Sequence, residues 1–299
     1  MLHLIDASVY VFRAYYSMPP DMADGDGNPV HAVYGFARFL CDLLERARPE
    51  YLAVAFDASL TSSFRNQIYP AYKANREPAP PDLLLQFERC RRFCDHLGLA
   101  WFDSNEFEAD DIIGTLAIRM RGEGLRATIV SRDKDLAQLI GPGDVYWDYS
   151  GNERFHHGQI ADRFGVPPER YADYLALTGD AVDNITGVPG VGPKTAAVLM
   201  KVYDSLEDLY ARLDTVRDLP LRGASKLPDK LALHREAAFL ARQLTRIRCD
   251  MPLPVTRADL RRRPPDLAAI EGFCSTNGFG QLLQRQATRL AGSSFGGMT

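Results

Sequence analysis

Short apolar runs alternate with helix-like segments along the first half of the chain, and this alternation constrains the fold more than any other sequence feature. Each run is nearly continuous in apolar residues and is bounded by turn residues, which is typical of strands buried on both faces. A repeated strand–helix order favours an α/β domain built around a central, mostly parallel sheet flanked by helices. The four expected strands lie within 2–7, 51–58, 97–103 and 126–133.

Helical periodicity fills the intervals between these strands and continues beyond them. In the first half, helices are expected at about 32–47, 82–96, 109–121 and 134–140. From about residue 157 the strand signals fade, and helices are expected at about 168–178, 193–202, 205–212 and 229–246. The pattern therefore predicts an α/β core over 1–165, a helical subdomain over 166–290 and a flexible Gly/Ser-rich tail over 291–299.

Length and composition fit such a globular protein and exclude several other classes. The chain has 299 residues, 46% of them hydrophobic and 25% charged, and no apolar run approaches the length of a membrane span. The N-terminus lacks the basic start of a secretory signal, and the five cysteines form no CxxC pair, as expected for reduced thiols. We expect a cytoplasmic monomer that does not contact membranes.

Three of the expected strands end on a carboxylate. Asp6 follows the first strand, Asp57 the second, and Asp133 the strand within 126–133. One such residue is usually a helix cap or a turn residue. In open parallel sheets, however, ligands bind outside the carboxyl ends of the strands, so three acids at that edge favour a functional site.

Further acids lie beside these three. Glu108 and Asp111 are three residues apart and share one helix face, and Asp180 and Asp183 repeat the spacing. Acids at a helix N-terminus are favourable in themselves, which explains one or two of them without any site. The full set of candidate metal ligands is Asp6, Asp57, Glu108, Asp110, Asp111, Asp133, Asp135, Asp180 and Asp183.

Converging carboxylates repel one another and are costly to desolvate unless cations neutralise them. Oxygen-only ligands suit Mg²⁺ or Mn²⁺ rather than Zn²⁺, and paired ions are the usual arrangement for displacement at phosphorus. A glycosidase-like acid/base pair is a weaker interpretation, because it needs only two carboxylates. The formal net charge of −4 becomes +5 without the nine candidate ligands, so the acidity does not exclude a nucleic-acid partner.

A long connection over 58–81 joins a strand to the next helix and is rich in proline. Long connections are usually functional or disordered, and interleaved cations and rings suit a nucleic-acid strand, although a solvated loop is equally compatible. The residues concerned are Phe64, Arg65, Tyr69, Tyr72, Lys73 and Arg76.

A glycine-rich segment precedes the helix expected at 193–202. It nearly matches a phosphate-binding Walker loop, but Pro193 separates Gly192 from Lys194 and no buried strand comes before it. Two interpretations remain open: a tight turn between helices, or a hairpin whose backbone and helix N-terminus contact nucleic-acid phosphate. The residues of this candidate DNA-binding hairpin are Gly187, Gly190, Val191, Gly192, Lys194 and Thr195.

These stretches, taken together, resemble the bacterial 5′-nuclease (flap endonuclease-like) family, which includes the N-terminal 5′→3′ exonuclease domain of DNA polymerase I. The matching segments are "LIDASVYVFRAYYSMPP", "AVAFDA", "FRNQIYPAYKANR", "EADDIIGTLA", "SRDKDLAQL", "LTGDAVDNITGVPGVGPKTA" and, more weakly, "EAAFLARQLTRIRCDMPL". They occur in the family's order over about residues 2–255, and the chain looks like a stand-alone member.

The resemblance implies a PIN-like nuclease core, a helical arch within about 58–90 and a helix–three-turn–helix motif for duplex DNA. It also implies that the nine acids hold two or more metal ions and that the 187–192 hairpin can hold a K⁺ ion. Lys73 and Arg76 match the basic pair at the base of the arch, Tyr72 the neighbouring aromatic, and Arg13 the arginine after the first Asp. These four are the candidate catalytic residues, with Tyr72 expected to stack on an unpaired base.

Two positions depart from the family pattern. Ala7 and Arg132 stand where Gly is common, and an Arg at a position with positive φ would strain the turn. Arg132 could instead reach a phosphate. Since Asp133 and Asp135 keep their spacing, the departures put the rate in question more than the activity.

The expected function is metal-dependent hydrolysis of DNA at 5′ ends, nicks and 5′ flaps in replication and repair, with RNA primer ends as a further substrate. The alternatives are a non-catalytic flap- or junction-binding protein and a ribonuclease on a similar acid-lined core. The basic segment 257–266 is equally compatible with a duplex contact and with a solvated linker.

Overall fold

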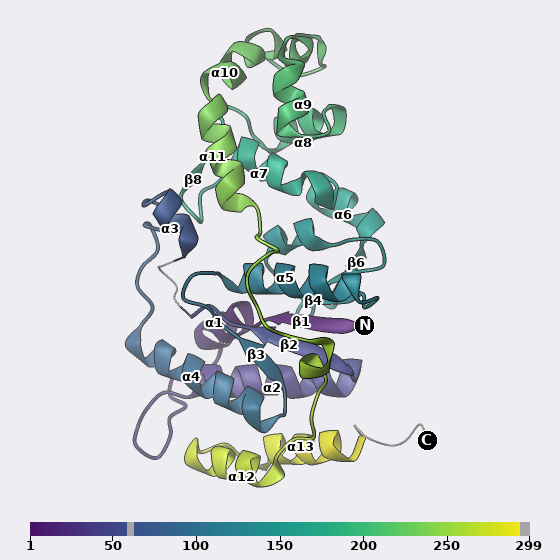
Figure 1. The fold of residues 1–299 in the computed structure, drawn as a ribbon. Helices are drawn as coiled ribbons and strands as arrows, with labels where there is room; N and C mark the ends of the chain where they lie inside the picture. The colour runs from purple at the N-terminus through teal and green to yellow at the C-terminus, as the bar shows by residue number, and fades with distance from the viewer. Residues whose placement is uncertain (59–62, 294–299) are drawn as a thin grey trace.

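The computed structural model describes residues 1–58 and 63–293, and its centre is a six-stranded sheet (Figure 1). The strand order is β3-β2-β1-β4-β5-β6, and every neighbouring pair is parallel except β5 and β6. The prediction of a mostly parallel α/β core is thereby confirmed. The strands are β1 (Leu2–Asp6), β2 (Tyr51–Ala55), β3 (Ala100–Phe102), β4 (Ala127–Val130), β5 (Val145–Asp148) and β6 (Glu153–His156).

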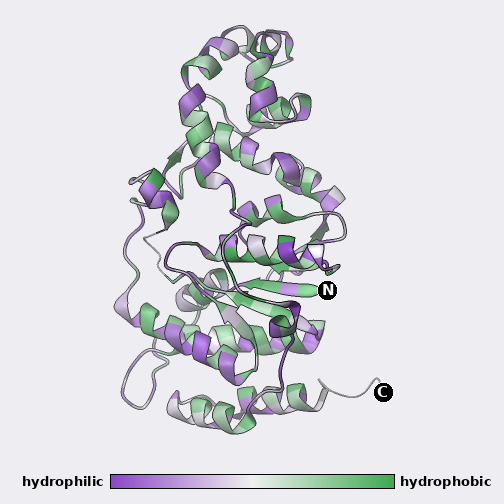
Figure 2. Cartoon of the chain, viewed as in Figure 1, coloured by the Kyte–Doolittle hydropathy of each residue, from purple (hydrophilic) through white to green (hydrophobic). Residues whose placement is uncertain are grey.

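Alternate residues of the central strands face two separate hydrophobic cores. On β1, Ile5 points to one face, whereas Leu2 and Leu4 point to the other. The strands are therefore buried on both faces, as their nearly continuous apolar sequence predicts, and Figure 2 shows them largely in the hydrophobic colour.

Helices cover both faces of the sheet. On one face lie α1 (Ala7–Ser17), α2 (His31–Ala47) and α4 (Pro81–His96), and on the other lies α5 (Ala109–Gly122), followed by the 3₁₀ helix η1 (Lys134–Leu139). The 134–140 segment, expected as a helix, is thus a 3₁₀ helix. The prediction omitted α1, β5 and β6.

A helical lobe with its own hydrophobic core follows the sheet. It contains the helices α7 (Tyr171–Thr178), α8 (Pro193–Val202), α9 (Leu206–Ala211), α10 (Leu227–Leu233) and α11 (Arg235–Thr245), and the short hairpin of β7 (Gly179–Asp180) and β8 (Ile185–Thr186). Shorter elements connect them: α6 (His157–Phe164), η2 (Pro168–Arg170), η3 (Leu213–Asp218) and η4 (Ala224–Lys226). The helix expected over 229–246 is divided between α10 and α11 at His234.

After α11 the chain returns to the α/β core, so the part of the expected 166–290 subdomain that follows Thr245 does not pack in the helical lobe. Ile247, Met251 and Leu260, the last within η5 (Arg257–Leu260), pack in the core beside α5. The final helices, α12 (Leu267–Thr276) and α13 (Gln281–Ser293), pack with α2 and α4 on the opposite face. Helical periodicity identifies a helix, but it does not say which core its apolar face will cover.

From residue 63, the segment expected as an arch contains a short helix, α3 (Phe64–Ile68), continues as turns and leads into α4. Residues 59–62 of this segment, and residues 294–299 of the expected tail, lie outside the described residues; within the tail, α13 extends to Ser293. The five cysteines are free. No helix in the described part of the chain is long and apolar enough to cross a membrane.

Candidate functional site

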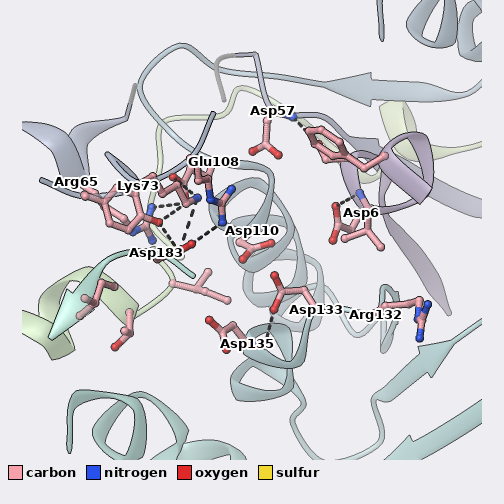
Figure 3. Close-up of a pocket in the computed structure, with 18 of the residues that line it drawn as sticks. Asp6, Asp57, Arg65, Lys73, Glu108, Asp110, Arg132, Asp133, Asp135 and Asp183 are labelled. Atoms are coloured by element: carbon pink, nitrogen blue, oxygen red, sulfur yellow. Dashed lines mark hydrogen bonds and ion pairs between the residues drawn. The ribbon is translucent and has the colours of Figure 1, made fainter. Parts of the chain in front are cut away.

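A cavity of about 490 Å³ opens at the carboxyl edge of the sheet, where the α/β core faces the helical lobe (Figure 3). Asp6 ends β1, Asp133 follows the neighbouring strand β4, and Asp57 follows β2. The strand order reverses between β1 and β4, which is the position where open parallel sheets bind ligands. The cavity is therefore where the strand-end acids predicted it.

Seven of the nine predicted acids line the cavity, as Figure 3 shows. Besides the three strand-end residues these are Glu108 and Asp110 at the start of α5, Asp135 in η1 and Asp183 from the helical lobe. Asp111 and Asp180 do not line it.

Short hydrogen bonds hold these carboxylates. Asp6 accepts from Ser131 Oγ at 2.7 Å, and Asp57 accepts from the backbone N–H of Ala109 at 2.9 Å. Asp133 accepts from the backbone N–H of Asp135, also at 2.9 Å. The loop after β4 is thus connected to the end of β1, and the loop after β2 to the N-terminus of α5.

The carboxylates share a buried, negatively charged environment. Burial, together with the neighbouring acids, raises the pKa of Asp6 to about 7 and that of Asp135 to about 8. The same causes raise the pKa of Asp110 well above its ordinary value, and burial also raises the pKa values of Asp57 and Asp133. Without cations, these five carboxyl groups therefore stay protonated to a higher pH than they ordinarily would.

The donor set fits a hard divalent cation. Asp135 Oδ1 is buried and has no hydrogen-bond partner among the described residues, which suits an atom that binds an ion. No three carboxylate, His or Cys side chains within 1–58 and 63–293 lie close enough to form a complete ligand set. Mg²⁺ characteristically binds proteins through one or two carboxylates and keeps several water or phosphate ligands.

Cations form the wall opposite the strand-end acids. Lys73 Nζ lies 2.8 Å from Glu108 and 3.8 Å from Asp183, and Arg76 pairs with Asp183 at 2.5 Å. Burial alone would raise the pKa of Glu108, but Lys73 and Arg65 lower it below its ordinary value. The predicted basic pair is thus in the cavity, held by two of its acids.

Tyr72 lines the cavity but does not present its ring for stacking. The residue is 3% exposed, and Lys73 Nζ covers the ring at 4.9 Å from the centroid. Its hydroxyl lies 3.0 Å from both Glu108 and Asp183. The ring of Tyr72 is therefore not accessible for stacking on a base in this structure, and its hydroxyl contacts two acids instead.

Asp111 is placed in a buried ion pair and not among the cavity carboxylates. It is fully buried and binds Arg65 through both carboxylate oxygens, at 2.7 and 2.8 Å. Glu108 and Asp111 are near each other, as their spacing predicts, but only Glu108 faces the cavity. The sequence pattern could not separate them, because both side chains occupy the first turn of α5.

Asp180 lies beside the cavity. Its carboxylate is 3.7 Å from Lys134 Nζ and adds to the negative charge that raises the pKa of Asp135. Asp180 therefore acts on the site through its charge in this structure.

The predicted hairpin lies in the helical lobe. Gly187 is buried, and a Cβ there would come 2.3 Å from the backbone nitrogen of Gly179, so this glycine serves close packing and not an accessible phosphate contact. Gly190 has φ +80°, Gly192 precedes α8, and both are exposed together with Lys194. Val191 is buried and Thr195 is half-buried.

The two departures from the family pattern cause no strain. Ala7 opens α1 in the core. The non-glycine residues with positive φ in the described chain are Arg48, Lys73, Asn152 and Asn184, so Arg132 is not among them. Arg132 and Arg13 both line the cavity.

Two serines that the sequence did not single out complete the site. Ser8 Oγ accepts from the backbone N–H of Asp57, and Ser131 donates to Asp6. Arg65, noted in the sequence only as a cation of the 58–81 connection, also borders the cavity. A signal for Ser131 was present, because it directly follows the strand β4 that leads to Asp133.

Two family models match the chain in succession, and they define its class as a nuclease with an α/β catalytic part and a helical part. The 5′-3′ exonuclease N-terminal resolvase-like domain covers residues 1–165, and the 5′-3′ exonuclease C-terminal SAM fold covers residues 166–268. The chain belongs to the 5′-3′ exonuclease family.

Two kinds of relatives have sequences similar to this chain: DNA polymerases I and stand-alone 5′-3′ exonucleases. DNA polymerase I of Rhizobium leguminosarum is 38% identical over 96% of this chain, but the match covers 28% of that polymerase. The chain spans about a third of the length of such polymerase relatives. A 5′-3′ exonuclease of Aquifex aeolicus is 34% identical, with 89% of this chain and 88% of that protein covered.

Solved structures share the fold. A T5 5′-exonuclease with bound divalent metal ions (zinc) matches 98% of this chain and 99% of that chain, with a TM-score of 0.67 and 18% identity. The catalytic core of Rad2 in complex with DNA matches with a TM-score of 0.61 and 15% identity. The mostly parallel sheet with its helical lobe is therefore a known arrangement.

Proposed function

We propose that this protein is a Mg²⁺- or Mn²⁺-dependent 5′ nuclease that hydrolyses DNA at 5′ ends, nicks and 5′ flaps and acts as a monomer. The observation that carries the proposal is the cavity in which seven acids face Lys73 and Arg76. The family membership supports DNA as the substrate, as do the DNA complexes of structural neighbours such as Rad2.

Asp6, Asp57, Glu108, Asp110, Asp133, Asp135 and Asp183 would hold the ions, with Asp180 close by. Bound divalent ions would supply positive charge at the scissile phosphate and make water more acidic. The chain itself supplies the geometry, since the hydrogen bonds from Ser131 and Ala109 fix the orientation of Asp6 and Asp57.

Lys73 and Arg76 bind the phosphate from the opposite wall. Both already lie in ion pairs with Glu108 and Asp183, so their charges are fixed before the substrate enters. Such fixed charges stabilise the negative charge that develops on the phosphate and need no rearrangement at the moment of reaction. Arg13 and Arg132 provide further positive charge at the edge of the cavity.

The helical lobe would hold the duplex. The exposed end of the hairpin at Gly190 and Gly192 leads into α8, where Lys194 lies in the first turn. Contacts of this kind read the backbone and not the base sequence, and they fit a nuclease that recognises structure. A K⁺ ion bound by the hairpin carbonyls is part of the proposal.

The deciding experiment incubates the protein with a 5′-labelled flap duplex in Mg²⁺, in Mn²⁺ or in chelator. We expect cleavage with either metal and none with chelator. Undiminished cleavage in chelator would refute the metal dependence, and tight flap binding without cleavage in any metal would favour the non-catalytic alternative. A competing RNA flap of the same sequence tests the ribonuclease alternative.

A further inference from the structure

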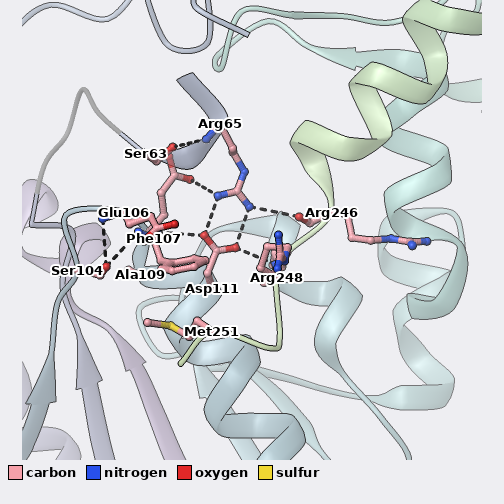
Figure 4. A network of polar contacts seen from close by, with 12 residues as sticks. Ser63, Arg65, Ser104, Glu106, Phe107, Ala109, Asp111, Arg246, Arg248 and Met251 are labelled. Atoms are coloured by element: carbon pink, nitrogen blue, oxygen red, sulfur yellow. Dashed lines mark hydrogen bonds and ion pairs between the residues drawn. The ribbon is translucent and has the colours of Figure 1, made fainter. Parts of the chain in front are cut away.

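The buried pair of Arg65 and Asp111 connects three parts of the chain that border the cavity. Arg65 lies in α3, Asp111 in the first turn of α5, and both contact the segment 244–248 that leads from the helical lobe back to the core (Figure 4). Arg65 is 2% exposed and Asp111 is fully buried.

Every N–H of the Arg65 guanidinium has an acceptor. Two donate to the carboxylate of Asp111, at 2.7 and 2.8 Å. The others donate to the backbone carbonyls of Leu244 at 2.8 Å and Arg246 at 3.2 Å, and to Glu108 at 3.5 Å. A lysine has a single ammonium group and cannot reproduce this planar set of contacts.

Both oxygens of the Asp111 carboxylate also accept hydrogen bonds. Besides Arg65, it accepts from the backbone N–H of Arg248 at 2.8 Å and from that of Glu108 at 3.1 Å. The last contact matters for the cavity, because it fixes the backbone of Glu108, whose side chain holds Lys73 at 2.8 Å. A chain of direct contacts thus runs from the helical lobe, through the ion pair, to a cation of the cavity wall.

We propose that Arg65 and Asp111 are positioning residues. They hold Glu108 and Lys73 in a fixed position relative to the segment 244–248, and Asp111 does not bind metal. The proposal rests on the proposed nuclease function for its rate measurement. Asp111 has no carboxylate oxygen left unpaired for an ion, in contrast to Asp135, whose Oδ1 lacks a partner among the described residues.

The test compares Arg65→Lys and Asp111→Asn with a matched control at the other end of the same helix. The control is Arg121→Lys, because Arg121 in α5 pairs with the fully buried Asp144 and does not line the cavity. For each variant we would measure the melting temperature, flap affinity in Ca²⁺, the single-turnover cleavage rate in saturating Mg²⁺, and the number of Mn²⁺ ions bound per chain.

We expect Arg65→Lys to fold, to bind the flap within about threefold of wild type, and to cut about 100-fold more slowly, the size of effect that a displaced catalytic group produces. Asp111→Asn should bind as many Mn²⁺ ions as wild type. Arg121→Lys should melt at a lower temperature and cut at the wild-type rate.

Three results would overturn the proposal: wild-type cleavage by Arg65→Lys, one Mn²⁺ fewer in Asp111→Asn, or an equal loss of rate in Arg121→Lys. If Asp111→Asn does not fold, the rate of Arg65→Lys decides. If wild type itself does not cut the flap, the proposed function fails, whereas the Mn²⁺ count still tests the role of Asp111.

Discussion

Lys73 has an unusual backbone conformation at a functional position. Its φ is +55°, in the left-handed region, and its N–H donates to the backbone carbonyl of Asp183 at 3.0 Å. Non-glycine residues in this region carry a conformational cost and often occur at functional sites. The hydrogen bond to the helical lobe holds this conformation, so the ammonium group enters the cavity from a fixed backbone.

Replacing Lys73 with Ala removes that fixed charge. We expect the single-turnover cleavage rate to fall by about 10²–10³-fold, because the developing charge on the phosphate loses a preorganised partner. Flap affinity in Ca²⁺ should change much less. Arg285→Ala, on the outer helix α13, is the control and should cut normally. A Lys73→Ala variant with the wild-type rate would remove Lys73 from the catalytic group.

Asp135 is the carboxylate best suited to bind an ion, because its buried Oδ1 has no hydrogen-bond partner within the described residues. Asp135→Asn should lower the cleavage rate by more than about 100-fold while flap binding stays measurable. It should also reduce the number of bound Mn²⁺ ions, which Asp111→Asn should not do. Normal Mn²⁺ binding by Asp135→Asn would contradict its role as a ligand.

At the scale of elements, the β7–β8 hairpin and α8 combine packing with an exposed edge. The packing part is Gly187 against Gly179, where an added Cβ would meet backbone atoms. The exposed part is Gly190, Gly192 and Lys194. The two interpretations of the glycine segment thus apply to different residues, with the tight turn at Gly187 and the phosphate contact proposed for the exposed residues.

Lys194→Ala should weaken duplex binding without changing the rate of the bound complex. The slope of log affinity against log salt should become shallower by about one, because one phosphate contact is lost. The measurement is flap affinity in Ca²⁺ at several salt concentrations. An unchanged slope would mean that α8 does not contact the DNA backbone.

At the scale of the whole molecule, the buried acids make the stability of the metal-free protein depend on pH. The pKa values of Asp6 and Asp135 are raised from 3.8 to about 7 and about 8. Folding therefore favours their protonated forms, and the stabilisation, complete below 3.8, is lost as pH rises through 7 and 8. His3 changes the stability in the opposite direction, because its pKa is lowered from 6.5 to about 4. This contribution varies with pH only between those two values.

The melting temperature in chelator should accordingly decrease between about pH 6.5 and about pH 9. Mg²⁺ should raise it most at the alkaline end, because the ions neutralise carboxylates that are then ionised. Thermal unfolding at several pH values, with chelator or with Mg²⁺, measures both effects. An increase with pH in chelator would contradict the shared negative environment.

The sequence was sufficient to predict those strands and site residues that depend on local patterns. Apolar runs predicted β1 to β4, and strand-end acids predicted the edge at which Asp6, Asp57 and Asp133 meet, since carboxyl ends of parallel strands share one edge. It missed α1, β5 and β6. It also missed α12 and α13, whose packing on α2 and α4 depends on a distant part of the chain.

The sequence was enough to predict which acids reach the carboxyl edge of the sheet, because the end of each apolar run along the chain is a property of the local pattern. Which acid faces the cavity and which lies in an ion pair depends on the packing of distant segments. Asp110 and Asp111 are neighbours in sequence, yet Asp111 meets Arg65 from a segment 46 residues away, and Asp110 faces the cavity. Burial and pairing are set by contacts between distant segments, and a sequence pattern does not contain those distances.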